Sequence, residues 1–197
     1  MSEPQDTPLT RKVQFENEPI DGQGVKELII AGTTWLETNQ EVVNSLNVFP
    51  VPDGDTGTNM MLTMRSALEE ILNSAERHAG KMFGAVAHGA LMGARGNSGV
   101  ILSQLWRGMA LSMETQAEMD TQHFIEALNQ ASLTAYKGVV RPVEGTILTV
   151  SKDVAAGAKA VNGSAQNAVE VLEAAVAAAA ESVERTPDLL PILKEAG

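Results

Sequence analysis

The 197-residue chain contains no cysteine, few aromatic residues and far fewer basic than acidic side chains. Without cysteine it can form neither a disulfide framework nor a cysteine-based zinc site, and it has no thiol nucleophile. The 14 Lys and Arg against 25 Asp and Glu give a formal net charge of −11, which argues against general binding to nucleic acids or anionic membranes. A polyphosphate ligand would therefore need metal ions or backbone amides to offset the repulsion.

The sequence also lacks a run of about 18 apolar residues, so no transmembrane helix is expected. Residues 1–20 carry three prolines, show no helical period and lack the apolar stretch of a secretory signal, which predicts a flexible N-terminal tail. Residues 21–197 form the predicted domain, and a hydrophobic content of 44% is enough for a core. The absence of cysteine suits a cytoplasmic location.

The apolar spacing predicts an all-α domain of about eight helices joined by short loops. Helices are expected from Asp21 onward, over 40–46, from 58 or 59 to about 76, over 79–92, from 97 or 98 through 109, and over 121–137, 145–161 and 165–184. Alanine and methionine should fill the core in place of aromatic residues. Two prolines at 187 and 191 predict that the chain closes with a short turn or helix.

Two aspartates separated by one glycine, Asp53 and Asp55, lie in the proline- and glycine-rich stretch 47–60. Carboxylates on a turn with little steric cover suit a hard cation. An ordinary turn also favours these residue types, although few surface turns need so much backbone specification. An EF-hand is excluded because Thr58 and Met64 stand where its glycine and glutamate should be. A site with few protein oxygens, completed by water and phosphate, is typical of magnesium.

A second glycine-rich stretch, Gly93-Ala94-Arg95-Gly96-Asn97-Ser98-Gly99, precedes a predicted helix. Such a turn can present N–H groups and the positive end of a helix dipole to an anion, with the Ser98 hydroxyl as a further donor. It could equally be a helix–helix corner that needs glycine for its backbone angles. Neither a P-loop nor a dinucleotide fingerprint occurs in the sequence. Taken together, the two stretches predict one loop for a metal ion and one for phosphates.

Four segments resemble a known family when they are taken together: NVFPVPDGDTGTNM, ARGNSGVILSQ, RPVEGTILTV and RTPDLLPILKEAG. They resemble the nucleotide-binding L domain of dihydroxyacetone kinases and, more closely, the N-terminal ATP-binding domain of bacterial fatty acid kinases. The resemblance covers about residues 21–197 and implies an all-α barrel of about eight antiparallel helices, with ATP bound at one end through two magnesium ions. The family continues beyond the last segment, so we expect a domain excised from a longer protein.

The resemblance also implies roles for individual residues. The metal ligands would be Asp53, Asp55 and a position at or beside Asn47. Two groups would contact the nucleotide phosphates: Thr56, Gly57, Thr58 and Asn59, and the turn of Gly96, Asn97, Ser98 and Gly99. The remaining nucleotide-binding residues would be Gly138, Thr146 and Ile147 near the nucleoside, and Arg185.

The implied activity is transfer of the γ-phosphoryl group of ATP to a fatty acid carboxylate presented by a separate acyl-binding protein, with an acyl phosphate as product. A carboxylic acid with a pKa of about 4 is ionised at pH 7 and needs no general base, and the sequence shows none. Regions beyond this chain would engage that partner, and a homodimer through them is a further expectation. The domain alone should be inactive or nearly so.

Three other interpretations stay open. The chain could be the nucleotide-binding component of a dihydroxyacetone (glycerone) kinase, a docking module that holds a nucleotide without turnover, or a helical scaffold that binds no nucleotide. The sequence does not identify the residue that stabilises the transferring phosphoryl group, for which Arg95 and Arg141 are the candidates.

Overall fold

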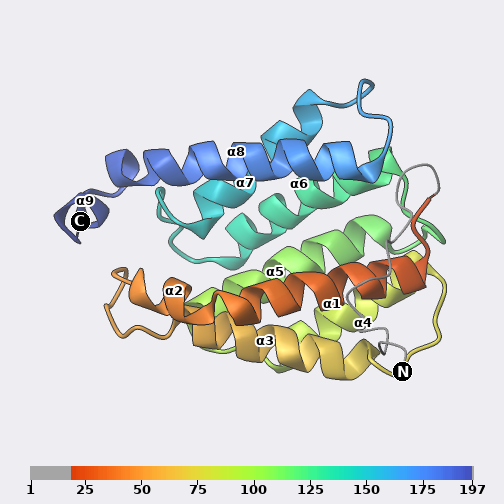
Figure 1. Cartoon of the computed structure of the whole chain (residues 1–197), viewed down its shortest axis with the longest axis horizontal. Helices are drawn as coiled ribbons and strands as arrows, with labels where there is room; N and C mark the ends of the chain where they lie inside the picture. Colours follow the sequence, from red (N-terminus) through yellow and green to blue (C-terminus); the bar gives the residue numbers. More distant parts are fainter. Residues whose placement is uncertain (1–18, 197) are drawn as a thin grey trace, which may run out of the picture.

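The computed structural model describes residues 19–196, which form nine helices and, apart from one bridge between Ile20 and Met119, no strand pairing. The helices are α1 (Gly22–Thr38), α2 (Gln40–Ser45), α3 (Thr56–Ile71), α4 (Ala79–Met92), α5 (Gly96–Met113), α6 (Thr121–Gly138), α7 (Ile147–Ala160), α8 (Ala168–Leu189) and α9 (Pro191–Ala196) (Figure 1). The predicted all-α architecture is confirmed. Residues 1–18 of the predicted tail lie outside the described residues. Within the described range, every helix is too short or too polar to cross a membrane.

Most helices lie where the apolar spacing predicts them, and α4 has the predicted bounds. The start of α3 differs, because this helix begins at Thr56 and not at 58 or 59. Asparagine side chains from before the helix accept hydrogen bonds from its first amides, which lets the helix start earlier. It also ends sooner, at Ile71, and a loop follows where the prediction continued to about residue 76.

The longest helix, α8, continues past its predicted end at 184 and contains Pro187. A proline inside a helix has no N–H, so the carbonyl four residues before it loses its helical partner. In α8 that carbonyl belongs to Val183, and the hydroxyl of Thr186 donates to it at 2.7 Å. This local replacement lets the helix pass through the proline to Leu189.

The helices of the described residues form a row, with no extensive contact between its first and last members. One group contains α1, α3, α4 and α5, with α2 lying against α3 and α1 (Figure 1). Next in the row, α6 packs against α5, while α7 and α8 pack against α6 and against each other, and α9 lies on α8. Among the described residues, neither α7 nor α8 packs extensively against α1–α5. The two groups of helices are therefore joined through α6.

The two ends of the bundle are built differently. At one end, backbone hydrogen bonds join segments that are distant in sequence. The backbone N–H groups of Ile20 and Met119 each donate to the other's carbonyl oxygen at 2.8 Å, and the Ala79 N–H donates to the Ala117 carbonyl at 2.7 Å. At the other end lie the connections before α3, before α5 and between α6 and α7, together with α9 (Figure 1). The candidate site is at this second end.

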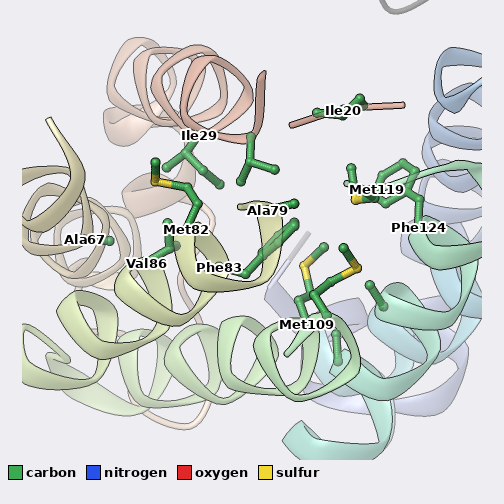
Figure 2. Close-up of a cluster of buried hydrophobic side chains, with 14 of the residues drawn as sticks. Ile20, Ile29, Ala67, Ala79, Met82, Phe83, Val86, Met109, Met119 and Phe124 are labelled. Atoms are coloured by element: carbon green, nitrogen blue, oxygen red, sulfur yellow. The ribbon is translucent and has the colours of Figure 1, made fainter. Parts of the chain in front are cut away.

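Methionine and alanine fill the core, as the composition predicts. Figure 2 shows Met82, Phe83 and Val86 of α4 among side chains from neighbouring elements, including Ile29 of α1 and Met109 of α5. Met82 and Val86 are fully buried. The flexible thioether of methionine adapts to irregular gaps between helices, while alanine lets the helices approach closely.

The packing of α5 on α6 depends on a glycine. A Cβ atom at Gly108 would lie 2.5 Å from both the Cα of Ala131 and the carbonyl oxygen of Gln130. We expect Gly108→Ala to lower the free energy of unfolding by about 1–3 kcal/mol, because the added methyl group pushes α6 away. In the control Gly32→Ala, where the new Cβ meets nothing within 4 Å, stability should rise by about 0.5–1 kcal/mol. Urea denaturation measures both changes, and equal effects of the two substitutions would contradict this account.

Candidate functional site

A pocket of about 960 Å³ opens at the end of the bundle where the connections before α3 and α5 meet. Its walls come from α2 and the α2–α3 connection, from the starts of α3, α5 and α7, from the α6–α7 connection, and from the end of α8 and α9. Ligand pockets in proteins have volumes of about 300–1,000 Å³, so the space suits a ligand at the large end of that range. Both stretches singled out in the sequence line it.

Asn47 fixes the loop that carries the two aspartates. Its side-chain Nδ2 donates to the carbonyl oxygen of Val51 at 2.7 Å. Its Oδ1 accepts hydrogen bonds from the Thr56 N–H at 3.2 Å and from the Thr56 hydroxyl. An amide oxygen has two lone pairs, and both are used here inside the loop. The structure therefore gives Asn47 the task of holding the loop, and its role as a metal ligand stays a prediction.

Asp55 occupies the N-cap position of α3, yet its side chain does not cap the helix. An aspartate there usually accepts from the first amides of the helix. In this structure Asn47 takes the Thr56 N–H, and Asn44 Oδ1 takes the Thr58 N–H at 3.0 Å. The Asp55 carboxylate is thus left without a hydrogen bond or ion pair to the described residues, as is that of Asp53, and both residues are exposed and line the pocket.

The start of α5 presents backbone donors to the same pocket. Its N-cap, Arg95, supplies no capping side chain, and the N–H groups of Asn97 and Ser98 find no acceptor in the described part of the chain. The Ser98 hydroxyl donates to the Thr56 carbonyl oxygen at 3.4 Å, which places the starts of α5 and α3 next to each other. The aspartates and the glycine-rich turn, although distant in sequence, thereby form one site.

The start of α7 lies at the pocket as a third helix N-terminus. Thr146 caps it by accepting from the Leu148 N–H at 3.3 Å, and its hydroxyl donates to the Val143 carbonyl at 2.8 Å. The N-termini of α3, α5 and α7 each carry a partial positive charge, which favours an anionic ligand. The pocket thus combines three anion-favouring helix ends with two carboxylates that suit cations.

Glu144 anchors the base of the α6–α7 connection. Its carboxylate accepts from the Thr149 hydroxyl at 2.6 Å and from the Tyr136 hydroxyl at 3.0 Å, and the Lys152 Nζ lies 3.8 Å away. The hydrogen bond from Thr149 holds the pKa of Glu144 below its ordinary value, and the hydrogen bond from Tyr136 and the positive charge of Lys152 lower it further. Burial, and then the bond to Glu144, raises the pKa of Tyr136. This network fixes the part of the α6–α7 connection that directly precedes α7.

Most of the residues predicted to bind metal or nucleotide line this pocket. They are Asn47, Asp53, Asp55, Thr56, Asn59, Gly96, Asn97, Ser98, Gly138, Thr146 and Ile147. Gly57, Thr58, Gly99 and Arg185 do not line it.

Three of these four residues hold helices together around the pocket. A Cβ at Gly57 would lie 2.3 Å from the Gln40 carbonyl oxygen, so the missing side chain lets α2 approach α3. The hydroxyl of Thr58 accepts from the side chain of Gln40 at 3.1 Å across the same contact. A Cβ at Gly99 would lie 2.3 Å from the Thr63 hydroxyl, so this glycine lets α5 approach α3.

Arg185 is committed to another contact. Its guanidinium donates to the Asp153 carboxylate at 2.9 Å, and the Ser182 hydroxyl donates to the same carboxylate oxygen at 2.6 Å. These bonds join α8 to α7. The neighbouring Thr186, and not Arg185, lines the pocket.

The residues at this site suit a magnesium ion with few protein ligands better than a metal ion held entirely by side chains. No cluster of three or more His, Asp or Glu side chains that could hold a metal ion occurs within residues 19–196. Of the described residues that line the pocket, only Asp53 and Asp55 carry carboxylates. Two carboxylates, with the other positions filled by water or phosphate oxygens, are the usual protein contribution to a magnesium site.

Two features of the site were not predicted from the sequence. Asn44 caps α3 from a neighbouring helix, and the only signal is a pair of asparagines, Asn44 and Asn47, just before the aspartate loop. The Glu144 network is the second feature, because nothing in the sequence shows that Tyr136 and Thr149 meet the same carboxylate.

Thr149→Val tests the network at the α6–α7 connection. The Thr149 hydroxyl accepts from the Gly145 N–H at 2.8 Å and donates to Glu144, so its loss leaves a buried N–H unsatisfied. The free energy of unfolding at pH 7 should fall by about 1–3 kcal/mol. The pKa of Glu144, measured by NMR titration, should rise toward its ordinary value.

The sign of the pH dependence follows from the lowered pKa. The contribution of Glu144 is present above its unfolded pKa of about 4.3 and is lost as the pH falls through its folded pKa. The stability difference between wild type and Thr149→Val should therefore be smaller at about pH 3 than at pH 7. Thr34→Val, which removes an exposed hydroxyl bonded only within α1, is the control. An unchanged Glu144 pKa in Thr149→Val would contradict the assignment.

Comparison with known proteins agrees with this geometry. The sequence profile described as "DAK2 domain" matches residues 50–197. Uncharacterized proteins of Staphylococcus aureus (strain bovine RF122 / ET3-1) and Staphylococcus epidermidis (strain ATCC 12228 / FDA PCI 1200) are 47% and 48% identical to the chain over 178 residues, which is 90% of this chain and 32% of each relative. The chain thus spans about a third of the length of the curated relatives it matches. It belongs to the DAK2 domain family, which has the nucleotide-binding fold of dihydroxyacetone kinases.

Proposed function

We propose that this domain binds ATP with magnesium and donates the γ-phosphoryl group to a fatty acid carboxylate held by a separate acyl-binding protein. One observation carries the proposal. One pocket of about 960 Å³ is lined by two carboxylates that have no partner among the described residues, and by the starts of α3 and α5. A hydrogen bond of 3.4 Å from Ser98 to Thr56 joins these two helix starts. Such a site offers both cation ligands and amide donors to a polyphosphate.

Asp53 and Asp55 are the residues that would hold magnesium. Their carboxylates are available because asparagines, and not Asp55, cap α3. When bound, magnesium would supply positive charge to the phosphate chain, which a protein of net charge −11 otherwise repels. The backbone N–H groups of Asn97 and Ser98, without acceptors among the described residues, would bind phosphate oxygens.

The proposed phosphoryl acceptor is a carboxylate, which reacts without a general base. A carboxylate oxygen attacks the γ-phosphorus, the bond from that phosphorus to the bridging oxygen of ADP breaks, and an acyl phosphate and ADP result. A carboxylate is already ionised at pH 7, so no proton has to be removed. Among the residues that line the described pocket there is no histidine, and the two carboxylates are the proposed metal ligands. An acid acceptor therefore needs nothing further from this lining, whereas a hydroxyl would need a base from the protein that holds it.

Replacement of the aspartates tests the nucleotide site. Asp53→Asn or Asp55→Asn keeps the shape of the side chain but removes the charge that attracts the cation. We expect magnesium-dependent binding of ATP to fall by a factor of about 100 or more, since a hard cation loses one of two charged ligands. Isothermal titration calorimetry measures the affinity, and circular dichroism should show an unchanged helix content. Glu118→Gln, which removes an exposed charge outside the pocket, is the control. Unchanged affinity in both aspartate variants would remove the metal assignment.

An activity assay separates the kinase from a docking module. It needs a complete protein of the length of the relatives, an acyl-binding protein and a fatty acid, because this chain spans 32% of those relatives. We expect ATP consumption that depends on all three components and is abolished by Asp53→Asn. Nucleotide binding without any ATP consumption would favour the docking module, and consumption with dihydroxyacetone alone would favour the glycerone kinase.

A further inference from the structure

The pocket has a pronounced imbalance of charged side chains. Between residues 19 and 196, its lining includes the carboxylates of Asp53 and Asp55 but a single basic residue, Arg141. Arg95, the other arginine considered from the sequence, does not line the pocket, and its guanidinium donates to the Ala94 carbonyl oxygen at 3.0 Å. The structure thus separates two candidates that the sequence left equal.

The guanidinium of Arg141 differs from those of the other described arginines. Arg65, Arg77 and Arg185 each form an ion pair with an acidic side chain, and Arg107 lies 3.5 Å from the side-chain oxygen of Gln104. Arg141 forms no hydrogen bond or ion pair with any residue from 19 to 196, although two carboxylates line the same pocket. An arginine that is left uncommitted beside an anion-favouring pocket is available to a ligand.

The backbone that carries Arg141 is held at its base. Glu144 receives hydrogen bonds from Tyr136 and Thr149, and the Gly145 N–H donates to Thr149 at 2.8 Å. The outer part of the connection faces solvent, since Val140 is 97% exposed. The anchored base holds the backbone next to Arg141, and the side chain of Arg141 is long and exposed at the pocket.

We propose that Arg141 binds the phosphate chain of the nucleotide directly, as the one cationic side chain that the described residues bring to the site. This inference rests on the proposed function, since it assumes that a nucleotide occupies the pocket. A guanidinium offers parallel N–H donors that match two phosphate oxygens, and it keeps its charge at every physiological pH. It complements the backbone amides of Asn97 and Ser98, which come from the start of α5. The site then neutralises phosphate charge with one side chain in addition to magnesium.

Calorimetric titration of the chain with Mg-ATP and with Mg-ADP tests this assignment. Arg141→Ala should weaken the binding of both nucleotides by about 10- to 100-fold, as the loss of a charged hydrogen bond does. Arg141→Lys should recover part of the affinity, because it keeps the charge but not the paired donors. The wild-type affinity should also fall more steeply with NaCl concentration than that of Arg141→Ala.

Arg107→Ala is the matched control, because it removes one exposed positive charge from a residue that does not line the pocket. Its nucleotide affinity should equal that of the wild type, and the unliganded melting temperatures of both alanine variants should match it too. If the wild type binds Mg-ATP and the two alanine variants bind it equally well, the role of Arg141 is overturned while the proposed function stands. If the wild type binds neither nucleotide, both fall together.

Discussion

The two hydrogen bonds from Thr56 to the side-chain oxygen of Asn47 decide how the rest of the site is arranged. They satisfy the first amide of α3, and Asn44 satisfies the amide of Thr58. Because asparagines provide these acceptors, Asp55 lies at the helix start and its side chain forms no capping hydrogen bond. A neutral side chain thus replaces a charged one in a structural task, and the charge stays available to a ligand. The loop conformation and its chemistry are consequences of the same contact.

The helix ends and the side chains of the pocket act on a ligand in opposite ways. Three helices begin at the cavity, so its backbone favours anions, while the acidic residues in its lining favour cations. Neither kind of ligand alone satisfies both. A phosphate compound that carries its own divalent ions does, because each charge then meets its complement. This balance explains how a strongly acidic protein can belong to a nucleotide-binding family.

Local patterns in the sequence were enough for the helices, and together with the family resemblance they pointed to some of the residues that line the pocket, while its lining residues from α2, α8 and α9 were not predicted. Residues 79–92 carry a clear apolar period and form a helix with those bounds, and the loop of Asp53 carries its own prolines and glycines. What the sequence could not show depends on partners that are distant in sequence or on a local exception. Arg185 meets Asp153 on another helix, and α8 passes through Pro187 because a neighbouring hydroxyl replaces the missing N–H. Pairings between helices cannot be derived from spacing along the chain alone.

The row of helices has a consequence for the whole fold. The walls of the pocket come from α2, α3 and α5 on one side and from α7, α8 and α9 on the other, and these two groups are joined through α6. A molecule that contacts both walls connects the two groups of helices directly. Its binding energy then stabilises the contact between the two groups, because α7, α8 and α9 can no longer separate from the rest without releasing the ligand. Occupancy of the pocket would accordingly protect α7 and α8 against local unfolding more than it protects α1.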